Sequence, residues 1–67
     1  MKAIILSRQD FREYDQRIIC YTLERGKQEY VARGLKKITS KLSSSLEPGS
    51  LLNIQTAQGK ELEYLIS

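Results

Sequence analysis

The sequence predicts a small all-β domain, a five-stranded and partly open Greek-key barrel with one short helix. Five short segments rich in β-branched, aromatic and leucine residues are separated by turn signals, as strands are. Apolar residues at helical spacing stand between the third and fourth of them. Three strands, a helix and two strands is the order of this barrel, and closure removes edges that an open sheet would expose.

The first three strands are predicted in the N-terminal half. Residues 2–8 carry a short apolar run, and the polar stretch 9–16 is interpreted as a loop. Alternation over residues 17–23 predicts the second strand. Gly26 can turn the chain into a third strand over residues 28–33, so the second and third strands form a hairpin.

The second half predicts the helix and two further strands. Because serines are weak helix formers, only a helix of about two turns is expected over residues 40–46, where Leu42 and Leu46 close one end of the barrel. Pro48 and Gly49 end this helix. The last two strands are predicted over residues 51–56 and 61–66, with Gly59 as the turn residue between them.

Composition excludes several classes of protein. The 67 residues are 40% hydrophobic and 28% charged, which is typical of a single folded domain. A single cysteine, Cys20, excludes an internal disulfide. Cys20 is expected to be a buried small hydrophobe, with a reactive thiol as the alternative. Because the sequence contains no histidine, the usual zinc sites cannot form. The apolar run near Met1 is too short for a signal peptide or a membrane span, so a soluble, cytoplasmic protein is expected.

Positive charge is concentrated in one part of the chain. The formal charge is +3, but residues 25–41 hold six basic side chains against Glu29 alone. Such a stretch is the electrostatic footprint of a polyanion binder, and a solvated basic loop is the alternative. The chain lacks a phosphate-binding loop and a nucleophile motif, so no enzyme, cofactor or small-molecule substrate is expected. The acids at 10, 13 and 15, flanked by arginines, are interpreted as salt-bridge partners rather than metal ligands.

Six segments of the chain share a pattern that is found in order and with nearly gap-free spacing in one known family. They are ILSR at 5–8, DFREYD at 10–15, TLERGK at 22–27, VARGLKK at 31–37, SKL at 40–42 and LEP at 46–48. Together they resemble the N-terminal domain of the RecO recombination mediators. The resemblance covers residues 1–67, with Arg12 where the family usually has glycine, Tyr14 where a small residue is usual, and Gly49 where a bulky residue often follows the proline.

This resemblance implies an oligonucleotide-binding (OB) fold, the five-stranded Greek-key barrel already predicted. It also implies a bacterial, nucleoid-associated mediator of DNA repair that binds single- and double-stranded DNA and anneals complementary strands. Such mediators work with RecR and the single-strand DNA-binding protein to load recombinase. The family continues into a helical region that is absent from this chain, so an isolated domain, a truncated piece or a short member is expected, and the functions of that region are not transferred to it.

The predicted nucleic-acid site combines basic groups for phosphates with a ring for base stacking. If Ile18 and Cys20 face the barrel interior, Tyr21 faces outward with its neighbours in alternation and is the best stacking candidate, with plain packing as the alternative. Tyr30 is a weaker candidate, because the outward face of the third strand is left open. The predicted contact residues are Arg17, Tyr21, Arg33, Lys36, Lys37 and Lys41.

Two rival functions remain open at this stage. Small barrels also dock proteins, so the chain could bind a recombination partner such as RecR without touching DNA. Outward apolar side chains would favour that interpretation, and Ile19 beside Tyr21 is the only hint of them. The third possibility is a structural barrel with incidental charge.

Overall fold

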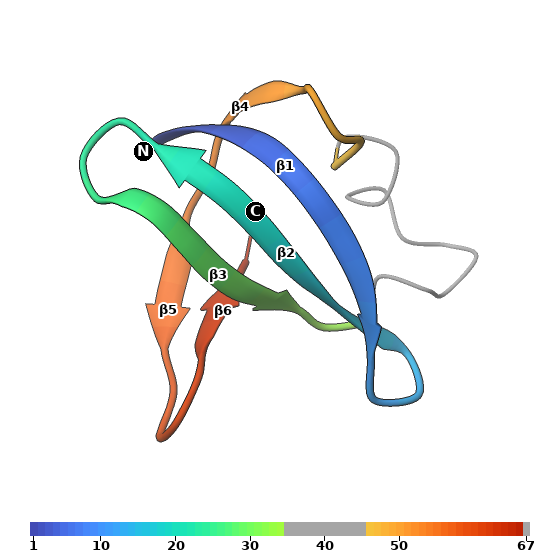
Figure 1. Cartoon of the computed structure of the whole chain (residues 1–67). Coiled ribbons are helices and arrows are strands. Elements are labelled where there is room, and N and C mark those ends of the chain that lie inside the picture. Colours follow the sequence, from blue (N-terminus) through green and yellow to red (C-terminus); the bar gives the residue numbers. More distant parts are fainter. Residues whose placement is uncertain (35–45, 67) are drawn as a thin grey trace.

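The computed structural model describes residues 1–34 and 46–66, which form one six-stranded sheet (Figure 1). The spatial order is β4-β1-β2-β3-β6-β5, antiparallel throughout except where β3 pairs with β6. The prediction of a small all-β domain is confirmed. The strands are β1 (Lys2–Phe11), β2 (Asp15–Thr22), β3 (Gly26–Ala32), β4 (Leu51–Asn53), β5 (Thr56–Gln58) and β6 (Glu63–Leu65).

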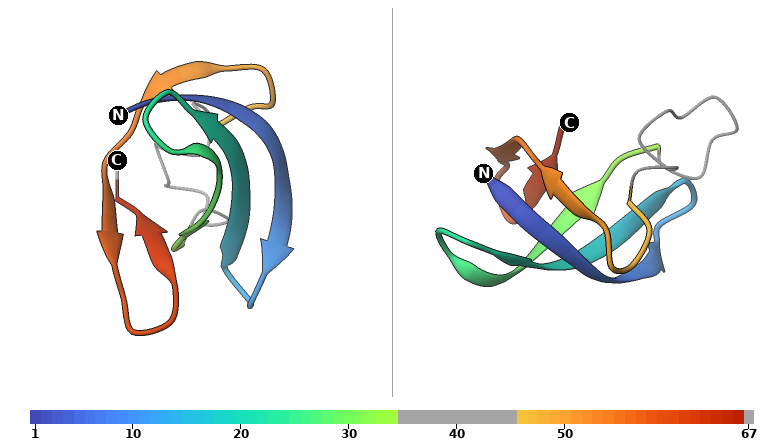
Figure 2. Two further views of the ribbon diagram at one scale, coloured as in Figure 1. Left: turned by 60° about the vertical axis from the view of Figure 1, so that its left-hand side comes forward. Right: turned by 90° about the horizontal axis from the view of Figure 1, so that it is seen from above.

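The two ends of the sheet are halves of one bent strand. Figure 2 shows the sheet curling so that a single stretch of chain runs from β4 into β5. Ile54 N donates a hydrogen bond to Met1 O (2.8 Å), whereas Ile66 N donates to Gln55 O (2.9 Å). The stretch therefore pairs first with the start of β1 and then with β6, which is how the single strand predicted over 51–56 becomes two. This arrangement is consistent with a small OB-like barrel.

The predicted loop over residues 9–16 is wrong. β1 continues to Phe11 and β2 begins at Asp15, with Gln9 opposite Arg17 and Phe11 opposite Asp15. Polar side chains on both faces of this two-stranded ribbon leave no hydrophobic alternation to identify it. Only residues 12–14 form the turn, and Arg12 has a φ of 58°, a left-handed conformation that favours glycine.

The core lies on the inner side of the curled sheet. Ile18 and Cys20 are buried there, as the alternation predicted, and burial raises the pKa of the Cys20 thiol. Leu46 is buried as expected, whereas Leu42 and the rest of the predicted helix, residues 40–45, lie outside the described residues. The core residues are Ala3, Ile5, Ile18, Cys20, Tyr30, Ala32, Leu46, Ile54 and Leu65.

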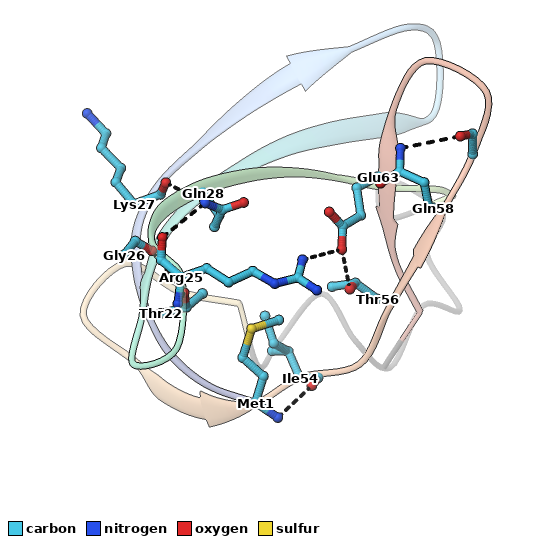
Figure 3. Close-up of polar contacts among 11 residues, drawn as sticks. Met1, Thr22, Arg25, Gly26, Lys27, Gln28, Ile54, Thr56, Gln58 and Glu63 are labelled. Carbon is cyan, nitrogen blue, oxygen red and sulfur yellow. Dashed lines mark hydrogen bonds and ion pairs between the residues drawn. The ribbon is translucent and has the colours of Figure 1, made fainter.

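Polar contacts tie the turn between β2 and β3 to the last strands (Figure 3). The Arg25 guanidinium donates a hydrogen bond to Glu63 Oε2 (2.9 Å), and the Thr56 hydroxyl donates to the same oxygen (2.6 Å). The bond from Thr56, followed by the contact with Arg25, lowers the pKa of Glu63. Two hairpins far apart in sequence are thereby joined across the inner side.

Candidate nucleic-acid interface

Alternation along β2 places three predicted side chains on the outer face of the sheet. Arg17 and Ile19 are half-buried there, and Tyr21 is 58% exposed. Tyr21 lies opposite Ile4 of β1 on one side and Lys27 of β3 on the other. The predicted outward orientation of Tyr21 is therefore confirmed.

The structure excludes Tyr30 as a stacking residue. It pairs with Ile18 on the inner side of the sheet and is 1% exposed, so no base could reach its ring. Glu29 faces outward, opposite Ile19. Val31 also lies on the outer side by alternation, but it is buried because its strand is flanked by β2 and by β6, where Tyr64 is its partner.

Three arginines converge on two aromatic rings where the β1–β2 ribbon ends. The Arg12 guanidinium carbon lies 4.7 Å from the centroid of the Phe11 ring, and that of Arg17 lies 4.8 Å from the same ring. The Arg33 carbon lies 4.3 Å from the centroid of the Tyr64 ring. We refer to Phe11, Arg12, Arg17, Arg33 and Tyr64 as the arginine–aromatic cluster.

Arg12 links the ribbon to β6, far away in the sequence. Its Nη2 donates a hydrogen bond to the Tyr64 hydroxyl (3.4 Å), and its guanidinium carbon is 6.0 Å from that ring. The bond from Arg12 and then the neighbouring Arg33 lower the pKa of the Tyr64 phenol, because positive charge favours the phenolate. Tyr64 thus lies in a positive environment.

Carboxylates neutralise part of the cluster. Arg12 pairs with Asp15 (Nε to Oδ2, 3.2 Å), and Arg17 pairs with Glu29. The other oxygen of Asp15 accepts a hydrogen bond from the backbone N–H of Gly34 (2.8 Å), which holds the end of β3 beside the ribbon. Within residues 1–34 and 46–66, no carboxylate forms an ion pair with Arg33. The cluster therefore keeps a net positive charge.

The opposite end of the outer face is an apolar groove. It has a volume of about 240 Å³ and a lining of almost entirely apolar surface. Leu23 is 77% exposed and Leu51 is 68% exposed, so this surface is open to solvent. The groove is lined by Lys2, Ala3, Ile4, Tyr21, Leu23 and Leu51.

The predicted contact residues are thus only partly brought together. Arg17 and Arg33 belong to the arginine–aromatic cluster, whereas Tyr21 belongs to the apolar groove. The lysines at 36, 37 and 41 lie outside the described residues. Sequence reasoning missed Phe11, Arg12 and Tyr64, although a phenylalanine directly before an arginine was a signal for the first two.

The described residues contain no helix long and apolar enough to cross a membrane. The same residues contain no cluster of three or more His, Cys, Asp or Glu side chains that could hold a metal ion. Of the acidic residues in the ribbon, Asp15 pairs with Arg12 and Asp10 accepts a hydrogen bond from Gln16 (3.2 Å). The predicted salt bridge is thus present at Asp15, whereas the hydrogen bond at Asp10 comes from an amide.

Comparison with known proteins agrees with the resemblance found in the sequence. The family model described as recombination protein O N terminal matches residues 1–67. The chain is 34% identical over 64 residues to the DNA repair protein RecO of Nocardioides sp., covering 96% of this chain and 26% of that protein. It is 32% identical over 65 residues to the DNA repair protein RecO of Desulforamulus reducens, covering 97% and 25%. The chain thus spans about a quarter of the length of these relatives, and it belongs to the recombination protein O N-terminal family.

Proposed function

We propose that this chain is a DNA-binding module that acts in DNA repair and recombination. Relatives named DNA repair proteins support the biological role. The arginine–aromatic cluster is the observation that carries the binding function, because guanidiniums can track phosphates while rings offer surfaces for bases. The lysines at 36, 37 and 41 follow within eight positions of Arg33 in the sequence, and we include them as further candidates for phosphate contacts.

The proposed mode of binding requires no chemical step by the chain. Phosphate contacts position a strand without reading its sequence, so both single- and double-stranded DNA can be held. Strand annealing and recombinase loading would be activities of the whole protein, as would any contact with RecR. This module would contribute DNA affinity to them. Within that scheme Tyr21 supplies a second ring, about 13 Å along β2 from Arg17 at the usual rise per residue.

Binding of labelled DNA over a range of salt concentrations tests this proposal. If Arg33 and the three following lysines contact phosphates, the logarithmic slope of single-strand affinity against salt should be near −3, at about 0.7 per contact. Replacing Lys36 and Lys37 together by alanine should flatten the slope by about 1.4. The matched control is Lys2→Ala combined with Lys27→Ala, which removes equal charge from the end of the outer face that carries the apolar groove. No salt-dependent binding by the unmodified chain would refute the function.

The apolar groove favours a second candidate function, which is docking of a protein. Exposed Ile4, Leu23 and Leu51 beside Tyr21 are the outward apolar side chains that such a surface needs. A charged residue in place of Leu23 would disturb a protein contact there without changing the arginine–aromatic cluster. Loss of a recombination partner by Leu23→Asp, with DNA affinity unchanged, would support this second function; retention of every partner would exclude it.

A further inference from the structure

Tyr64 is placed where a ligand ring could use it. It lies on β6 opposite Val31, on the outer side of the sheet, and it remains partly accessible to solvent. Two guanidiniums from other elements approach its ring: that of Arg33 at 4.3 Å from the centroid and that of Arg12 at 6.0 Å. Both arginines are exposed, so each can shift to admit a ligand.

Backbone packing fixes the position of this ring. A β-carbon added at Gly59 would lie 2.7 Å from Tyr64 Cε2 and 3.3 Å from Cδ2, so the ring edge rests directly on the glycine of the β5–β6 turn. The turn backbone therefore blocks movement of the ring in that direction. A rigid ring loses little conformational entropy when a second flat group stacks on it.

The charges around the ring point to an anionic ligand. Arg12 and Arg17 each have a carboxylate partner, but among the described residues none pairs with Arg33, which is the guanidinium nearest the ring. Unstacked nucleobases pack on aromatic rings and on guanidinium planes, and phosphates flank every base. A single strand supplies both groups, whereas the bases of a duplex are already stacked.

We infer that Tyr64, together with Arg12 and Arg33, forms a stacking site for an unpaired nucleobase and its flanking phosphates. This inference rests on the proposed function and deepens it, because it assigns the arginine–aromatic cluster to single-stranded DNA. It also adds a stacking residue, Tyr64, to the one that the sequence predicted, Tyr21.

Fluorescein-labelled oligothymidylate of roughly 16 nucleotides, the upper end of the site size of one such barrel, is the probe. The second probe has the same length and phosphates but abasic sugars throughout. Tyr64→Ala should weaken binding of the first probe roughly five- to hundredfold and leave binding of the second unchanged. Tyr64→Phe keeps the ring and should bind both probes as the unmodified chain does.

Two further variants keep the test decisive if Tyr64→Ala fails to fold. Arg33→Lys retains the charge but removes the planar group, so it should weaken binding of intact DNA while leaving the salt slope unchanged. Tyr64→Leu keeps an apolar side chain against Gly59 without a stacking ring, and it should behave as Tyr64→Ala does.

The possible outcomes separate this inference from the proposed function. Equal losses on the intact and abasic probes, or no loss on either, would overturn the inference while DNA binding itself stands. If the unmodified chain binds neither probe, the proposed function fails as well. An aromatic peptide that competes with abasic DNA for the cluster would indicate a protein ligand instead.

Discussion

The two ends of the outer face share strands β1 and β2 but differ in chemistry. At one end, the ribbon of β1 and β2 meets Tyr64 of β6 and Arg33 in the arginine–aromatic cluster. At the other end, the same two strands and β4 form the apolar groove around Tyr21. Each end contains a tyrosine, but within the described part of the chain only Tyr64 of these two lies among guanidiniums. One sheet surface can therefore present a site suited to a polyanion beside another suited to an apolar partner.

A β-bulge in β1 separates the two ends. The register with β2 shifts between Ile5 and Ser7, so Ile4 faces outward before the shift and Ser7 lies opposite the outward Ile19 after it. Ile5 remains in the core, and Arg8 turns to the inner side, where its guanidinium pairs with Glu47 (3.2 Å). The extra residue thus brings Ser7, Gln9 and Phe11 to the outer face, where uninterrupted alternation from Ile4 would have placed Leu6, Arg8 and Asp10.

The largest difference between the ends is expected from removing charge at the arginine–aromatic cluster. Arg12→Ala combined with Arg33→Ala should flatten the salt slope of single-strand binding by about 0.7 for the phosphate contact of Arg33, and by about 1.4 if Arg12 contributes a further contact. Affinity should fall roughly tenfold or more, because a hydrogen bond to a charged group contributes about 1.5 to 3 kcal/mol. Lys2→Ala with Lys27→Ala, assayed by the same fluorescence anisotropy, is the control. An equal effect of both pairs would show that DNA does not distinguish the ends.

Sequence reasoning identified the elements that a hydrophobic pattern specifies. The β2–β3 hairpin followed from alternation and from Gly26, which has a positive φ of 72°, and the burial of Ile18 and Cys20 followed from the same alternation. The β1–β2 ribbon extends away from the core with polar residues on both faces, so its strands resembled a loop. Local pattern is informative only where one face is buried.

The arginine–aromatic cluster was harder to predict because its members meet through the fold. Arg17 and Arg33 were chosen for their charge, but Tyr64 reaches Arg12 across a sequence separation of 52 residues. The parallel pairing of β3 with β6 creates that contact, and no local signal specifies a parallel register. Tyr21 was correctly placed outward, yet its apolar surroundings come from β1 and β4 rather than from its own strand.

A smaller effect on DNA binding is expected at the apolar groove. Tyr21→Ala should lower single-strand affinity by about 1 kcal/mol, at the low end of the range for lost stacking, because no arginine stands over its ring among the described residues. The salt slope should stay unchanged, since no phosphate contact is lost. Anisotropy titrations at several salt concentrations measure both quantities. A loss larger than that of Tyr64→Ala would make the apolar groove the principal base-binding site.

Acid should weaken the contact between Arg25 and Glu63 that joins the β2–β3 turn to the last strands. The pKa of Glu63 is lowered in the folded protein, so its stabilising effect is present above the ordinary glutamate pKa of about 4.3 and is lost as pH falls through the lowered value. Glu63→Gln should reduce stability at neutral pH by about 0.5 to 1 kcal/mol and leave it nearly unaffected in acid. Thermal unfolding at a series of pH values measures this. A constant difference between the two proteins down to pH 2 would contradict the assignment.

The smallest effect concerns the backbone of Arg12, which has a φ of 58° at the tip of the ribbon. Arg12→Gly removes a partly exposed ion pair with Asp15 and the contact with Phe11, but it also relieves the left-handed conformation. The lost contacts and the relieved backbone conformation nearly cancel, so the free energy of unfolding should change by less than about 0.5 kcal/mol. Arg12→Ala loses the same contacts without the relief and should be less stable than Arg12→Gly by about 1 kcal/mol. Urea unfolding of the three proteins gives the order. If alanine and glycine were equally stable, the turn would not hold residue 12 in this conformation, and the arginine would not be aimed at Tyr64 by its backbone.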